Sequence, residues 1–151
     1  MKRDFVLTAF TSLTLLVSLV SFSPPRGAGL VDDVLSYTNK FRKSHGLGSL
    51  IMRDDLNAIA KKHSENMARG RIGFGHGGFN QRFNQASKMI KGFKTFAENV
   101  AYGARSGKEA VTMWKNSSGH RRNMLGRYRY IGIGTAKDRH GVMYYTQVFA
   151  N

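Results

Sequence analysis

The stretch from Tyr130 to Ala150, YIGIGTAKDRHGVMYYTQVFA, contains two runs of strand-forming residues separated by a short polar turn. YIGIGTAK and GVMYYTQVFA are rich in β-branched and aromatic residues, which fit a pleated strand. Between them, Asp138, Arg139, His140 and Gly141 supply the residue types that close a hairpin. This pattern predicts an antiparallel hairpin at the end of the chain.

Upstream of the hairpin, the clearest pattern is helical. In RDDLNAIAKKHSENMARG, apolar residues recur at helical spacing from Leu56 through Ile59 to Met67, with aspartates before them and Gly70 after them. His63 falls on the same face. We therefore expect it to be a core histidine that is hydrogen-bonded to the backbone, with a role as a ligand as the alternative.

Three more helices are predicted. LVDDVLSYTNKFRKSHG has apolar residues on one helical face, and a short helix is expected from Phe79. Ser106 and Glu109 form a capping box, which opens a helix that carries Trp114 and ends near Gly119. TFAENVAYG reads as a strand or as the extended start of a helix. Helices first and strands last predict an α+β domain with an antiparallel sheet.

Composition limits the classes of function. The chain has 151 residues, enough for one domain, and no cysteine, which excludes disulfides and thiolate metal sites. The formal net charge is +15, from 24 Lys and Arg against 9 Asp and Glu. Such a charge attracts polyanions, namely nucleic acid, anionic lipid or acidic wall polymers, although it also fits a basic surface without a dedicated partner.

Residues 1–28 have the pattern of an export signal. Lys2 and Arg3 precede an apolar run, and Pro24 and Pro25 end it. Asp4 and the lack of a small-residue cleavage site leave an uncleaved membrane anchor as the alternative. In both cases residues 29–151 form the folded domain and lie outside the cytoplasm, secreted or extracytoplasmic. Nucleic acid is then not an expected partner, and membrane contact is expected only through the uncleaved segment.

Three polar residues lie where packing alone would not place them. His76 is in the glycine-rich FGHGG, Glu98 is in FAENVAYG, and His120 is in SSGHRRN. Two imidazoles and a carboxylate could hold a divalent metal with one open position, or could form an acid–base group. The alternative is that the histidines are separate surface residues and that Glu98 caps a helix or pairs with an arginine.

Other catalytic arrangements are not supported. Ser117 and Ser118 lie too close in sequence to His120 to present a hydroxyl to it, and no third group is evident to orient the imidazole. The chain also lacks the HExxH motif of zinc proteases and the P-loop of nucleotide-binding proteins.

Five motifs occur in order, HSENMA, FGHGGFNQR, AENVAYG, WKNSSGHRRNML and YIGIG…YYTQVFA. Together they resemble the CAP superfamily of cysteine-rich secretory, antigen and pathogenesis-related proteins, and most of all its cysteine-free bacterial SCP-like extracellular domains. The resemblance covers about Leu30 to Asn151. It implies an α-β-α three-layer sandwich with a central antiparallel sheet. It also implies a cleft with two histidines and two acids, which binds zinc in some relatives.

By this resemblance, His76 and His120 match the cleft histidines and Glu98 matches the first acid, although Ala97 replaces a usual glycine. Ser117 stands at the place of the second acid. The implied metal set is therefore His76, Glu98 and His120 alone. We expect zinc to bind weakly, and no cofactor to be required.

The resemblance implies a secreted, monomeric binding module that takes a lipid, envelope or other extracellular ligand in this cleft. Ser117 is included among the residues lining it. Two alternatives stay open. One is a metal-assisted hydrolase or protease that uses the same cleft, and the other is an envelope-associated structural protein that acts through its basic surface. Catalysis is less expected than binding.

Overall fold

The computed structural model describes residues 29–151, so the segment 1–28, predicted to be a signal or anchor, lies outside the described residues. Nine elements follow one another: α1 (Leu30–Lys43), β1 (Ile51–Met52), α2 (Asp54–Ala68), α3 (Phe79–Met89), β2 (Phe96–Tyr102), α4 (Gly107–Asn116), α5 (Ser118–Met124), β3 (Tyr130–Lys137) and β4 (Met143–Ala150). Within this range no helix combines the length and apolar character that a membrane crossing requires.

Four strands form one sheet in the order β1-β3-β4-β2. The predicted hairpin is confirmed, because β3 and β4 pair antiparallel, and β2 pairs antiparallel with the other side of β4. The expectation of a purely antiparallel sheet needs one correction, since β1 pairs parallel with the start of β3. β1 has only two residues, Ile51 and Met52, and so short a strand carries no periodic signal in the sequence.

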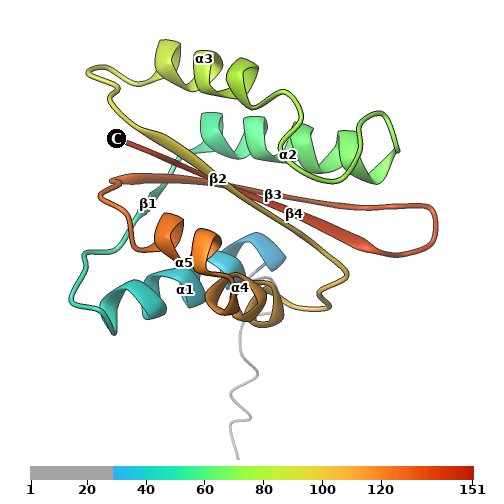
Figure 1. The fold of residues 1–151 in the computed structure, drawn as a ribbon, viewed down its shortest axis with the longest axis horizontal. Coiled ribbons are helices and arrows are strands. Elements are labelled where there is room, and N and C mark those ends of the chain that lie inside the picture. Colours follow the sequence, from blue (N-terminus) through green and yellow to red (C-terminus); the bar gives the residue numbers. More distant parts are fainter. Residues whose placement is uncertain (1–28) are drawn as a thin grey trace, which may run out of the picture.

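The elements form three layers, with α2 and α3 on one face of the sheet and α1, α4 and α5 on the other (Figure 1). This confirms the α-β-α sandwich. Close approach of α2 to the sheet depends on two glycines of β3. A Cβ on Gly132 would lie 2.3 Å from the main-chain carbon of Leu56, and one on Gly134 would lie 2.0 Å from the amide nitrogen of Lys61.

The opposite face of the sheet is packed around Trp114 of α4, which is 1% exposed and contacts a core that includes Tyr145 and Phe149. The predicted start of α4 is confirmed. Ser106 accepts a hydrogen bond from the Glu109 amide at 3.2 Å. β2 forms one edge of the sheet, and helices of both outer layers, α3 on one side and α4 and α5 on the other, contact it. The candidate site lies there.

Candidate functional site

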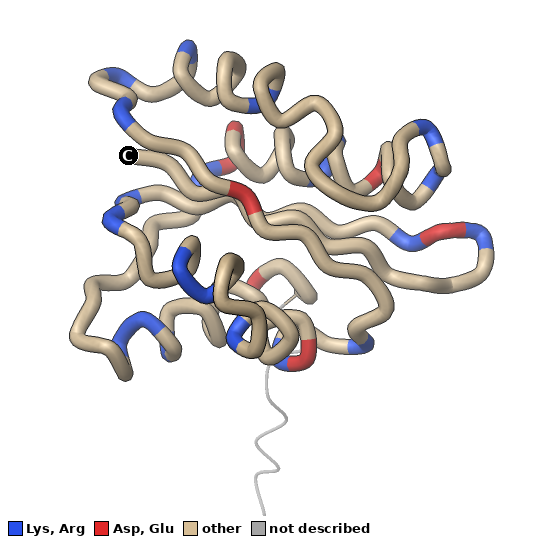
Figure 2. The backbone as a smooth tube through the Cα atoms, viewed as in Figure 1, with Lys and Arg blue, Asp and Glu red and all other residues tan. Residues whose placement is uncertain are grey.

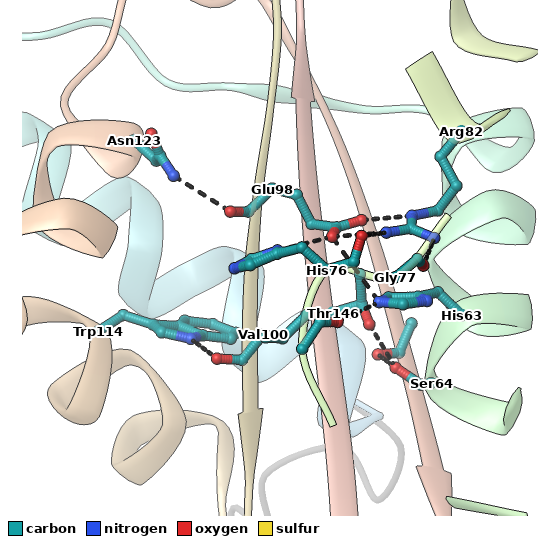
Figure 3. Close-up of polar contacts among 12 residues, drawn as sticks. His63, Ser64, His76, Gly77, Arg82, Glu98, Val100, Trp114, Asn123 and Thr146 are labelled. Atoms are coloured by element: carbon teal, nitrogen blue, oxygen red, sulfur yellow. Dashed lines mark hydrogen bonds and ion pairs between the residues drawn. The ribbon is translucent and has the colours of Figure 1, made fainter. Parts of the chain in front are cut away.

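Glu98 lies in the middle of the edge strand β2, and its side chain is fully buried on the side of α2 and α3. An ionised carboxylate in such a place requires charged or hydrogen-bonding partners. Figure 3 shows that these partners come from three segments that are distant in sequence: α2, the glycine-rich loop before α3, and α3 itself.

Arg82 of α3 is the principal partner of Glu98. Its Nε donates to Glu98 Oε2, and its Nη2 donates to Glu98 Oε1 at 2.8 Å, so that both carboxylate oxygens are held by one planar guanidinium. Arg82 also donates to the main-chain oxygens of His76 at 3.3 Å and Gly77 at 2.8 Å. It therefore fixes the carboxylate and the glycine-rich loop together, and the expectation that Glu98 could pair with an arginine is confirmed.

His76 is brought to Glu98 by that loop. Its Nδ1 lies 2.8 Å from Glu98 Oε1, and its side chain is half exposed. Because a carboxylate only accepts hydrogen bonds, Nδ1 carries the proton and donates it. In the neutral ring Nε2 then has a free lone pair, and this end of the ring points away from Glu98 (Figure 3). The site thus presents an oriented imidazole nitrogen at the surface.

His63 of α2 is buried beside this pair. Its Nε2 lies 2.8 Å from the carbonyl oxygen of Gly75, to which it donates, and 3.7 Å from Glu98 Oε1. Within residues 29–151, its Nδ1 has no hydrogen-bond partner. Burial lowers the pKa of His63 below its ordinary value of 6.5, with the nearby Glu98 charge partly opposing this effect. The predicted core histidine bonded to the backbone is confirmed, and it also borders the site.

His120 lies in α5 and not at the end of the Trp114 helix, which corrects the expectation from the sequence. α4 stops at Asn116, because Ser117 adopts an extended conformation and a second helix starts at Ser118. His120 is thus in the first turn of a short helix. Burial, together with the neighbouring His76, lowers the pKa of the His120 imidazole.

Two asparagines tie α5 to β2. Asn99 donates to the main-chain oxygen of His120 at 3.2 Å, and Asn123 donates to the main-chain oxygen of Glu98 at 3.1 Å and to the side-chain oxygen of Asn99 at 2.9 Å. These bonds hold the backbone of His120 against the strand that carries Glu98. Within residues 29–151, the His120 ring itself makes no hydrogen bond to His76 or Glu98.

Ser117 connects α4 to α5. Its amide donates to the carbonyl of Trp114 at 3.3 Å, and its side chain makes no capping hydrogen bond. It brings no charge to the site, so its role as a residue lining the cleft stays a prediction.

The model of the cysteine-rich secretory protein family, CAP, matches residues 35–149. The chain belongs to the CAP family. It is 34% identical over 121 residues to the membrane protein YlbC, and 32% identical over 104 residues to the protein YkwD, both from Bacillus subtilis (strain 168). These matches take in 77% and 67% of this chain but only 33% and 40% of the relatives, so the chain spans well under half the length of each.

Solved structures give the same fold. The CAP domain aligns with an extracellular protein containing an SCP domain from Bacillus anthracis str. Ames, with a TM-score of 0.69 and 27% identity over 80% of this chain and 40% of that one. An outer surface protein from Borrelia burgdorferi aligns with a TM-score of 0.71 over 83% of this chain and 95% of that one, at 20% identity, which supports the fold alone.

The polar residues of this CAP domain do not fit a metal ion in the arrangement observed. Within residues 29–151, no three His, Asp or Glu side chains are grouped so that they could hold one. Both oxygens of Glu98 accept from Arg82, and the His76 nitrogen nearest to Glu98 donates its proton. The weak zinc site expected at His76, Glu98 and His120 stays a prediction, and a zinc ion there would have to replace the bonds that Glu98 accepts from Arg82 and His76.

A cavity of about 430 Å³ is lined by residues of α2, the glycine-rich loop and α3. His63 and Arg82, which both lie beside Glu98, form part of its wall. Its other polar residues are Lys62, Asn66, Gln81 and Gln85.

Sequence reasoning missed Arg82, Asn99 and Asn123. A signal for Arg82 was present, because it lies three residues after Phe79 and four before Ala86, on the face of α3 that is expected to be buried. A buried carboxylate also demands a cation. The two asparagines gave no such signal, since their positions depend on how α5 docks against β2.

Proposed function

We propose that this CAP domain is an extracytoplasmic binding module whose ligand contacts His76 at the edge of the sheet, between the glycine-rich loop and α5. The observation that carries the proposal is the oriented imidazole. His76 is half exposed, and its Nδ1 is held by a carboxylate that is itself fixed by Arg82. A polar group held by supporting hydrogen bonds can bind a ligand with little loss of conformational entropy.

The location outside the cytoplasm is supported by relatives. One aligned structure is that of an extracellular protein with an SCP domain, and another is a cysteine-rich secretory protein from Staphylococcus aureus subsp. aureus Mu50 at 25% identity. The apolar character of residues 5–22 supports the same location. We expect a lipid or an anionic envelope polymer as the ligand, because the formal net charge is +15 and Lys and Arg are spread over every layer of the fold (Figure 2).

Hydrolysis is a weaker proposal, although a His–Glu pair is a recognised general base. Within residues 29–151, no serine or threonine hydroxyl is hydrogen-bonded to His76. The edge of β2 is also closed to an extended peptide. The main-chain oxygens of Glu98 and Val100 already accept from Asn123 and Trp114.

The test uses two probes, vesicles containing phosphatidylglycerol and soluble fragments of bacterial cell wall. For whichever of the two probes binds the wild-type chain, we expect His76→Ala to weaken binding about tenfold. This is the effect of losing one hydrogen bond of about 1.4 kcal/mol. His140→Ala is the matched control, because His140 is an exposed histidine in the β3–β4 turn and is expected to leave binding unchanged.

Equal losses in the two variants, or none in either, would show that the cleft does not bind the probe. If binding instead disappears with added salt in both variants alike, this supports the alternative of an envelope-associated structural protein that acts through its basic surface.

A further inference from the structure

We propose that Arg82 is the permanent positive partner of Glu98 in this CAP domain, and that it prevents divalent metal ions from binding Glu98. The inference is independent of the proposed ligand, since it concerns only what neutralises the buried carboxylate. It starts from charge. The Glu98 side chain is fully buried, so a positive group must lie within a few ångströms of it.

Among residues 29–151, Arg82 is the positive group that makes two hydrogen bonds to Glu98. His63 lies 3.7 Å away, but burial lowers its pKa and favours the neutral ring. His76 is half exposed and makes a single contact with Glu98. A guanidinium keeps its charge throughout the physiological range and matches the shape of a carboxylate with two parallel hydrogen bonds. Arg82 makes both of these bonds to Glu98.

The two hydrogen bonds from Arg82 leave few lone pairs of the Glu98 carboxylate available to a metal ion. Oε2 accepts from Arg82, and Oε1 accepts from both Arg82 and His76. A zinc ion bound to Glu98 would also lie within a few ångströms of the guanidinium, and two cations repel strongly at that distance in a buried site. Binding of the same ion by His76 Nδ1 would require the ring to move its proton to Nε2 and to give up its hydrogen bond to Glu98.

Arg82 is not free to swing away. Its side chain is 9% exposed, and its other donors hold the carbonyls of His76 and Gly77. Displacing the guanidinium would therefore break the bonds that shape the glycine-rich loop. A metal would have to offset these losses before it gained any ligand. Arg82 thus acts as a positioning residue that holds Glu98 and the glycine-rich loop in place without a metal ion.

The experiment titrates Zn²⁺ alone into the wild-type chain, Arg82→Gln, Glu98→Gln and the double variant, with calorimetry and thermal unfolding as readouts. We expect Arg82→Gln to bind Zn²⁺ at least about tenfold more tightly than wild type and to regain melting temperature when the metal is added. The double variant, which lacks the carboxylate, should lose this gain. A purely structural role of Arg82 would lower stability without creating metal affinity.

The proposal would be overturned if the wild-type chain and Arg82→Gln bound Zn²⁺ equally tightly and Glu98→Gln abolished binding in both backgrounds. If Arg82→Gln does not fold, the NMR resonance of the Arg82 Nε–H group in the wild-type chain tests the proposal instead. We expect saturating Zn²⁺ to leave this resonance unchanged. A zinc-dependent shift or loss that Glu98→Gln prevents would mean that the metal displaces the guanidinium, contrary to the proposal.

Discussion

The indole N–H of Trp114 donates to the main-chain carbonyl of Val100 at 3.0 Å, from a helix to the outer edge of the sheet. Two residues earlier on β2, the carbonyl of Glu98 accepts from Asn123 in the same way. Exposed strand edges invite pairing with other chains. These two bonds occupy two main-chain acceptors of the strand edge beside the site, so we expect a ligand to contact the side chain of His76 and not the backbone of β2.

Trp114→Ala should destabilise the domain by about 3–5 kcal/mol, because it removes the packing of a buried tryptophan. Trp114→Phe should cost less, about 1–3 kcal/mol, since it keeps most of the apolar contact but leaves the Val100 carbonyl without its donor. Urea unfolding measures both. Trp114 is the only tryptophan, so its fluorescence should also be that of a buried indole, and a solvent-exposed emission spectrum would contradict its place in the core.

Arg82→Gln should destabilise the domain by about 3–5 kcal/mol, because it leaves the Glu98 carboxylate buried without its cation. Arg82→Lys should recover only part of the lost stability, since an ammonium group cannot form two parallel hydrogen bonds to the two carboxylate oxygens. A double-mutant cycle with Glu98→Gln should give a large coupling energy. Additive effects would show that the two side chains do not interact in solution.

Stability should decrease as the pH falls below about 6.5. The pKa of His63 is lowered in the folded chain, mainly by burial, so below 6.5 the unfolded chain binds more protons than the folded one. The loss should stop once the pH passes below the folded pKa. His120 contributes in the same direction, because its pKa is also lowered.

His63→Gln isolates the contribution of His63 to this pH dependence. The glutamine amide can still donate to the carbonyl of Gly75 but cannot take up a proton. Urea unfolding between about pH 5 and 7.5, on either side of the histidine pKa, should show a shallower slope in the variant than in wild type. An identical slope would mean that other groups control the effect.

Gly134→Ala should cost about 3 kcal/mol or more, since the added Cβ would lie 2.0 Å from the amide nitrogen of Lys61 and backbone cannot yield as a side chain does. Gly119→Ala is the control. A Cβ added at Gly119 would have no atom within 4 Å, and alanine favours the helix by up to about 1 kcal/mol. Thermal unfolding of the two variants compares them directly, and a tolerated Gly134→Ala would disprove the close contact between α2 and β3.

The sequence by itself determined the helices α1 to α4, the terminal hairpin and the buried position of His63. These features depend on local periodicity, caps and turns, which neighbouring residues specify. Two local details went unseen, the two-residue strand β1 and the break at Ser117, because each is too short to produce a period. That break is why His120 belongs to α5.

Only the tertiary structure decided what Glu98 binds. Both the metal set and the arginine partner were compatible with its place in the sequence. Arg82 is sixteen residues away along the chain, and His76 is twenty-two away. Both reach the carboxylate, because α3 and the glycine-rich loop pack over β2. Long-range packing thus decides which of the groups that the sequence permits surround Glu98, because a buried charge needs a group that neutralises it in place.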